Sequence, residues 1–134
     1  MEIKEYAAYR EEEIVRLYSA AGWTAYTENL SALREGFARS LLVLAAYEGD
    51  ELLGLLRAVG DGATIVFIQD LLVFPRQQRR GVGTALVRAA AERFRGVRQI
   101  ELCTDDTPEA KAFYRSLGFR EFPELGCCGF MKCR

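Results

Sequence analysis

The sequence predicts an α+β fold, an α/β sandwich on a mixed, mostly antiparallel sheet. Three observations lead to this prediction. Residues 9–39 carry apolar side chains at helical spacing, and residues 41–73 form three apolar runs separated by turn signals. After Pro75 the pattern alternates helix, strand and helix. The chain has 134 residues, which is the size of one domain, so a single domain over residues 1–134 is expected.

The first half should place a pair of helices before an antiparallel meander. Ile14, Leu17 and Tyr18 share one helical face, and the pair Gly22-Trp23 interrupts that helix. Residues 60–62 read Gly-Asp-Gly, a hairpin turn. The expected elements are a strand over residues 2–6, helices over 9–20 and 28–39, and strands over 41–47, 51–59 and 64–73.

The second half should contain two more helices, which makes about four in all. An apolar stripe from Val82 to Phe94 predicts one helix, and residues 99–103 predict a strand. The next helix should begin at Thr107 as N-cap with Pro108 at its first position, and Gly118 should end it. Residues 120–124 and 127–133 are expected to form a terminal pair of short strands.

Composition narrows the chemistry before any motif is considered. The chain has no histidine, which excludes Ser-His and Cys-His nucleophile pairs and imidazole metal sites. The formal net charge of −1 does not indicate a nucleic-acid-binding surface. No apolar run is long enough to cross a bilayer, and the start of the sequence does not resemble a signal peptide. We therefore expect a cytoplasmic protein with no nucleic-acid or membrane partner.

The four cysteines allow two interpretations. Cys127, Cys128 and Cys133 lie close together near the end of the sequence, as zinc ligands often do. No histidine and no second paired motif accompanies them, however, and the fourth cysteine, Cys103, is distant in sequence. Reduced thiols that serve as small strand residues are the favoured interpretation, and no metal is expected.

The most informative segment is a basic loop that leads from a strand into a helix with two glycines. Arg76, Arg79 and Arg80 precede Gly81 and Gly83. The first turn of a helix offers unpaired N–H groups and a partial positive charge, which suits a phosphate or pyrophosphate. The loop lacks the GxxxxGK[ST] string of a Walker site and the third glycine of a dinucleotide fingerprint. The alternative without a ligand is a plain helix start at a glycine packing contact.

Two motifs carry a family resemblance. Residues 78–83, Gln-Arg-Arg-Gly-Val-Gly, resemble the Q/R-x-x-G-x-G/A signature of the GNAT N-acetyltransferase superfamily. Residues 110–119 resemble the family's A-x-x-F-Y-x-x-x-G-F segment and follow at the right distance. The resemblance covers essentially the whole chain, although the first forty residues match only in pattern. It implies a GNAT-like sheet with two splayed parallel strands.

The resemblance also implies acetyl-CoA as the acetyl donor. The pantetheine arm would pair with the backbone of one splayed strand, and the pyrophosphate would lie on the loop amides. This chain has Thr107 where many members carry an asparagine that binds pantetheine, which leaves that contact in doubt, since Thr107 is also a helix cap. The implied cofactor-binding residues are Leu71, Leu72, Val73, Gln78, Arg79, Arg80, Gly81, Val82, Gly83, Thr84, Thr107 and Phe113.

The implied reaction is direct attack of a primary amine on the thioester in a ternary complex. Tyr114 matches the family's general acid, which protonates the departing thiolate. Asp70 is the first candidate for general base, with Glu101, Glu28 or a water chain as alternatives, and a structural carboxylate is its other interpretation. Gln69 and Asp70 should face opposite sides of a regular strand, so a bulge would be needed to bring both to the cleft.

The acceptor is expected to be a small-molecule amine. In the family the helix pair forms much of the acceptor site, which assigns Trp23, Tyr26, Glu28 and Gln69 to substrate binding, and Trp23 could equally be a core side chain. Acetylation of a peptide or protein amine, a catalytically silent acyl-CoA sensor and a nucleotide-binding module remain alternatives. Many relatives dimerise, and the C-terminal strands could lie at the edge of a homodimer.

Overall fold

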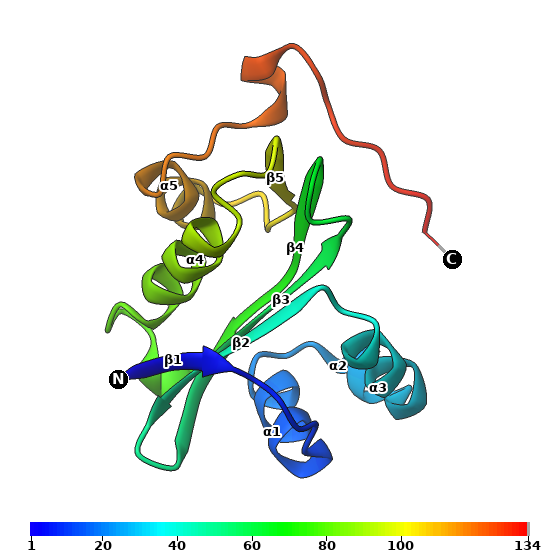
Figure 1. Cartoon of the computed structure of the whole chain (residues 1–134), viewed down its shortest axis with the longest axis vertical. Coiled ribbons are helices and arrows are strands. Elements are labelled where there is room, and N and C mark those ends of the chain that lie inside the picture. Colours follow the sequence, from blue (N-terminus) through cyan, green and yellow to red (C-terminus); the bar gives the residue numbers. More distant parts are fainter. Residues whose placement is uncertain (134) are drawn as a thin grey trace. The chain divides into compact units, whose positions relative to one another are not determined.

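A five-stranded mixed sheet forms the centre of the larger part of the molecule (Figure 1). The computed structural model describes residues 1–133. It divides into two compact units, a larger one over residues 1–103 and a smaller one that begins at residue 104. The strands follow the sequence order β1-β2-β3-β4-β5, with antiparallel pairing up to β4 and parallel pairing of β4 with β5. Their bounds are Glu2–Glu5 (β1), Leu42–Glu48 (β2), Glu51–Gly60 (β3), Ile65–Val73 (β4) and Gln99–Leu102 (β5).

Strand β4 is paired along one edge far further than along the other. Its pairing with β3 runs from Val66 to Val73, whereas β5 pairs only with the segment from Ile65 to Ile68. Within residues 1–103, no strand therefore pairs with the β5-facing edge of β4 beyond Ile68. The predicted parallel pairing is confirmed: β5 pairs with β4 along its whole length and ends at Leu102, beyond which β4 continues without a partner on this edge.

A bulge in β4 changes which side chains face the same way. Arg57 of β3 pairs with Asp70, but the next residue, Ala58, pairs with Ile68, so Gln69 is the extra residue. A bulge of this kind turns a side chain that would otherwise point to the opposite face.

Helices α1 to α3 cover one face of the sheet and α4 covers the other (Figure 1). Three glutamates in the first turn stabilise α1, because their negative charges lie near the positive end of the helix dipole. Asn29 caps α3, since its side chain accepts a hydrogen bond from the Ala32 N–H. The core on this side contains Ile14, Leu17 and Leu55. The helices are Glu11–Ala20 (α1), the single turn Thr24–Thr27 (α2), Leu30–Ala38 (α3) and Val82–Arg93 (α4).

Helix α4 packs closely on the sheet because β3 carries a glycine beneath it. A Cβ on Gly54 would lie 2.7 Å from the Leu72 carbonyl oxygen and 3.2 Å from Val82 Cγ1. A side chain there would collide with the β4 backbone at Leu72 and would crowd Val82 at the start of α4. The helix buries Val82, Leu86, Val87 and Ala90, as the apolar stripe predicts.

The smaller unit contains α5, Pro108–Ser116, followed by a short 3₁₀ helix, Phe122–Leu125. Thr107 caps α5 as predicted, since its side chain accepts a hydrogen bond from the Ala110 N–H at 3.2 Å. The prediction of two terminal strands over residues 120–124 and 127–133 is wrong. Glu121 and Glu124 form a capping box around the 3₁₀ helix, and residues 126–133 adopt no regular structure.

Candidate active site

The basic loop between β4 and α4 has a backbone that only a few residue types adopt easily. A 3₁₀ turn over Pro75–Gln77 leads into Arg79, at φ 65°, and Gly81, at φ 81°. Gly81 is the N-cap of α4 and supplies no side chain to cap it. Glycine takes this left-handed conformation without a steric cost, which explains its presence at the helix start.

The loop leaves a run of backbone donors free. The first intrahelical hydrogen bond of α4 runs from the Ala85 N–H to the Gly81 carbonyl, at 3.0 Å. Among residues 1–133, the N–H groups of residues 79–84 donate to no acceptor. These donors lie at the positive end of the α4 dipole, and together they form an anion-binding site of the kind that holds phosphate.

The three arginines of the loop have different surroundings. Arg76 donates to Glu51 at 2.7 Å, and Arg80 donates to Oε1 of the buried Gln77 at 2.7 Å. Arg79 is exposed and has no ion-pair partner within the described part of the chain. Arg79 is therefore the loop arginine that is free to meet an anion, and Arg80 is held by the loop itself.

The predicted pantetheine strand lies directly before this loop. Leu72 is buried and Leu71 and Val73 are half-buried, so the side chains of these residues pack in the fold. Their backbone belongs to the segment of β4 that β5 does not reach. The core interpretation and the predicted main-chain role of these three residues are therefore compatible.

Three of the four residues predicted to bind the acceptor, Trp23, Tyr26 and Gln69, contact one another in the structure. Gln69 Nε2 donates to Tyr26 Oη at 2.9 Å, which the bulge makes reachable from the helix side of the sheet. Trp23 stacks on Tyr26 with ring centroids 5.8 Å apart and is packed against the core, which favours its structural interpretation. Glu28 is exposed and makes no side-chain hydrogen bond or ion pair within residues 1–133.

Asp70 lies in a buried network of side chains. Both Tyr18 Oη and Arg57 Nε donate to its Oδ2 at 2.7 Å, and its exposed fraction is 0%. Its second oxygen, Oδ1, receives no hydrogen bond from residues 1–133 and is also buried. The carboxylate has no surface that an amine could reach, which favours the structural interpretation over the general base. Both hydrogen-bond partners of the carboxylate are side chains.

Arg57 was not among the predicted site residues. It is 6% exposed and is the ion-pair partner of Asp70. The available signal was one charged residue inside the apolar run of β3, Leu52 to Val59, because a buried charge needs a partner in the fold.

The buried tyrosines make the stability of the protein sensitive to high pH. Burial, followed by the Asp70 charge, raises the pKa of Tyr18 far above its ordinary 10, and burial together with Glu13 raises the pKa of Tyr6. Below pH 10 these groups are protonated in both states, and their stabilising contribution is complete. Above pH 10 the unfolded tyrosines lose protons that the folded ones keep, so the free energy of unfolding should fall.

For Tyr18 the expected decline is about 1.4 kcal/mol per pH unit once the unfolded tyrosine has ionised. Urea unfolding from about pH 8 to about pH 11 would measure it. Tyr18→Phe should show a shallower decline over the same range. Equal declines in the two proteins would contradict this account of Tyr18.

Tyr114 lies in an aromatic cluster within the smaller unit. Its ring meets Phe113 and Phe119 edge-on, with centroid distances of 4.9 and 5.8 Å. Burial raises the pKa of Tyr114 to about 12. The phenol therefore stays protonated at neutral pH and is able to donate a proton.

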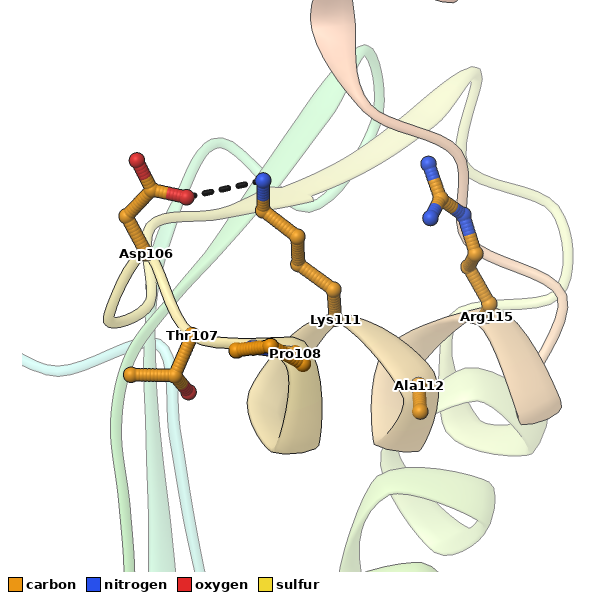
Figure 2. A pocket seen from close by; sticks show the side chains of 6 residues that line it. All are labelled: Asp106, Thr107, Pro108, Lys111, Ala112 and Arg115. Atoms are coloured by element: carbon orange, nitrogen blue, oxygen red, sulfur yellow. Dashed lines mark ion pairs between the residues drawn. The ribbon is translucent and has the colours of Figure 1, made fainter.

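The other face of α5 borders a hollow of about 530 Å³ in this unit (Figure 2). Lys111 and Arg115 project from α5 on the same side, and Lys111 Nζ lies 2.8 Å from Asp106. Arg115 pairs with Glu124 at 2.8 Å. Both cations already have carboxylate partners, so the hollow does not offer free positive charge.

Comparison with known proteins decides the family. A model of the acetyltransferase (GNAT) family matches residues 6–119. The chain belongs to this family. A GNAT-family acetyltransferase from Streptococcus pneumoniae TIGR4 is 35% identical with a TM-score of 0.89, over 99% of this chain and 97% of that one. The chain is thus an N-acetyltransferase by family. A search of curated proteins found no match.

Two further structures share the GNAT fold. An aminoglycoside 6′-acetyltransferase type Ii is 25% identical with a TM-score of 0.77, over 90% of this chain and 84% of that one. The PaiA N-acetyltransferase from Thermoplasma acidophilum, solved in complex with coenzyme A, is 15% identical with a TM-score of 0.73, over 90% of this chain and 91% of that one. At that identity the second likeness shows the fold alone.

None of the helices over residues 1–133 has the length and apolar character needed to cross a membrane. In the same residues, no group of three or more cysteine, aspartate or glutamate side chains is arranged to hold a metal ion. All four cysteines are free and exposed.

Proposed function

We propose that this GNAT protein transfers the acetyl group of acetyl-CoA to the primary amine of a small molecule. The observation that carries the proposal is the run of free N–H groups at residues 79–84, beside the open edge of β4. An anion site next to an unpaired strand edge matches the two ends of coenzyme A, its pyrophosphate and its amide-bearing arm. The coenzyme A complex of the PaiA relative agrees with this cofactor.

In this proposal the pyrophosphate lies on the loop from Gln78 to Thr84, where residues 79–84 offer free N–H groups and the Gln78 N–H already donates to the Pro75 carbonyl, and Arg79 adds a free charge. The pantetheine amides pair with the main chain of Leu71, Leu72 and Val73. Thr107 contributes less, because its hydroxyl oxygen already caps α5. Phe113 is proposed as an apolar contact for the cofactor. The family match spans both structural units, which supports the prediction of one domain.

The proposed chemistry is direct attack of a neutral amine on the thioester carbonyl. A C–N bond forms, the C–S bond breaks, and the products are an amide and coenzyme A. Tyr114 gives its proton to the departing thiolate, and the proton that the amine nitrogen loses is returned through solvent to the Tyr114 phenolate. The Tyr114 phenol is protonated at neutral pH, so its proton is available when the thiolate forms.

A small acceptor is supported by two relatives. One is the aminoglycoside 6′-acetyltransferase described above, and a second aminoglycoside acetyltransferase, from a soil metagenome, was solved with sisomicin. Tyr26 and Gln69 are the proposed acceptor contacts, since they meet at the bulge just before the proposed thioester position. Asp70 is proposed to hold this part of β4 in place and to have no role as base.

Gly81→Glu should abolish coenzyme A binding. A glutamate there is strained at φ 81° and places a negative charge among the donors meant for the pyrophosphate. The dissociation constant measured by calorimetry should rise by at least about 100-fold, because several charge-assisted hydrogen bonds are lost.

Gly49→Glu is the matched control. Gly49 also has a positive φ, of 59°, and open space around it, but it lies in the turn between β2 and β3. This variant adds the same charge at another glycine with positive φ, and its coenzyme A affinity should stay within a few-fold of the wild type. Normal binding by Gly81→Glu would overturn the proposed site.

A further inference from the structure

A second cavity lies between the helix pair and the sheet in the larger unit. Its volume is about 210 Å³, and among its lining side chains only Arg57 carries a charge. The lining residues are Ala25, Tyr26, Asn29, Ala32, Leu33, Gly36 and Arg57. A cavity that is mostly apolar, with a few polar groups and one buried cation, has the composition of a small-ligand site.

The Arg57 guanidinium has donors left over. Nε donates to Asp70, and Nη1 donates to Ser40 Oγ at 3.3 Å. Among residues 1–133, the N–H groups of Nη2 have no acceptor, although the side chain is only 7% exposed. Asp70 therefore occupies Nε and Ser40 accepts one N–H of Nη1, which leaves the other N–H of Nη1 and both of Nη2 available to a ligand.

Two residues near the Arg57 guanidinium, Gly36 and Asn29, help to form this site. Gly36 of α3 allows the guanidinium to pass, since a Cβ there would lie 3.2 Å from Nη1. Asn29 accepts two hydrogen bonds at Oδ1, from the Ala32 N–H and from Ser31 Oγ. Its Nδ2 donors have no acceptor within the described residues, and Asn29 is among the residues that line the same cavity.

Tyr26 links the cavity to the part of β4 where the acetyl group is proposed to lie. Tyr26 lines the cavity and accepts a hydrogen bond from Gln69, which precedes the proposed thioester contacts by two residues. A molecule anchored at Arg57 would therefore extend along Tyr26 toward the open edge of β4.

We propose that this cavity binds the carboxylate of the acceptor, and that the acceptor is a small amino acid. The inference rests on the proposed acetyl transfer and narrows its substrate class. A planar carboxylate accepts two parallel hydrogen bonds from a guanidinium edge, and Asn29 supplies a third donor. No carboxylate lines the cavity, and Asp70 is engaged by Arg57 and Tyr18, so an ammonium group finds no counter-ion there.

The test compares matched acceptors. Small α- and ω-amino acids are each assayed beside their carboxamide and their decarboxylated amine, with acetyl-CoA as donor and thiol release as readout. The amino acid should have a kcat/KM about 10- to 100-fold above both partners, the range expected for charge-assisted hydrogen bonds.

Two variants then remove the recognition. Arg57→Lys keeps the charge and loses the planar edge, and Gly36→Ala crowds Nη1 while favouring the α3 helix. In both variants the kcat/KM for the amino acid should fall toward the values for its carboxamide and its decarboxylated amine. Arg39→Lys, on the exposed end of α3, is the control and should leave the preference unchanged.

A binding arm separates the two proposals. The same amino acids are titrated into the intact protein, with and without coenzyme A. Amino-acid binding that Arg57→Lys weakens supports the inference even where no product forms. Equal turnover of acid, amide and amine overturns it and leaves acetyl transfer intact. Absence of coenzyme A binding overturns the proposed function instead, and absence of any carboxylate binding overturns the inference.

Discussion

Asp70→Ala is expected to lower the free energy of unfolding by about 3–5 kcal/mol, because it leaves a buried charge without its partner. Arg57 would keep its positive charge in a side chain that is 7% exposed, with Asp70 Oδ2 no longer present 2.7 Å from Nε. Tyr18 would also lose the acceptor for its buried hydroxyl. Urea unfolding by linear extrapolation would measure the change.

Two controls show whether burial is the cause. Glu35→Ala breaks the exposed pair with Arg39, at 3.2 Å, and should cost less than about 1 kcal/mol. The double variant Asp70→Leu with Arg57→Met removes both charges and should be more stable than Asp70→Ala alone. A loss below about 1 kcal/mol in Asp70→Ala would contradict the structural role assigned to this carboxylate.

Tyr114→Phe is expected to lower kcat by about 10²- to 10⁴-fold, the usual contribution of a general acid. Within residues 1–133 the Tyr114 hydroxyl makes no hydrogen bond, so the change should leave the fold intact. The coenzyme A dissociation constant should stay the same, since the hydroxyl is proposed to act on the thiolate alone. Steady-state kinetics on the best acceptor, together with calorimetry, would measure both quantities.

Tyr9→Phe is the matched control for this variant. The Tyr9 hydroxyl is buried without a partner in the larger unit, and its loss should leave kcat unchanged. The test needs conditions in which chemistry limits the rate, which a single-turnover experiment provides. An unchanged single-turnover rate in Tyr114→Phe would remove this tyrosine from the mechanism.

The sequence supported most of the fold because local chemistry and periodicity agreed there. Thr107, Pro108 and Gly81 mark helix starts through capping and backbone preferences that depend on few neighbours. The prediction of two terminal strands was wrong for a local reason as well. Pro123 and the reciprocal pair of Glu121 and Glu124 favour a capped turn, and these signals oppose a strand.

The site was harder to predict, because one bulge in β4 determines where the side chains of Gln69 and Asp70 point. On a regular strand Gln69 and Asp70 would face opposite sides, and the sequence does not show where an extra residue is inserted. The bulge pairs Asp70 with Arg57 inside the fold and leaves Gln69 exposed beside Tyr26. Burial of Asp70 then favours a structural carboxylate, and the free edge of Arg57 emerges only in three dimensions.

Titration of acetyl-CoA into the intact protein by calorimetry tests the central claim most directly. ATP and NADH serve as comparison ligands, since they share phosphate groups but lack the pantetheine arm. The account predicts one saturable acetyl-CoA site, with much weaker binding of both nucleotides, because the β4 edge recognises the arm and the α4 loop recognises the phosphates. Absence of acetyl-CoA binding, or equal affinity for the three ligands, would contradict it.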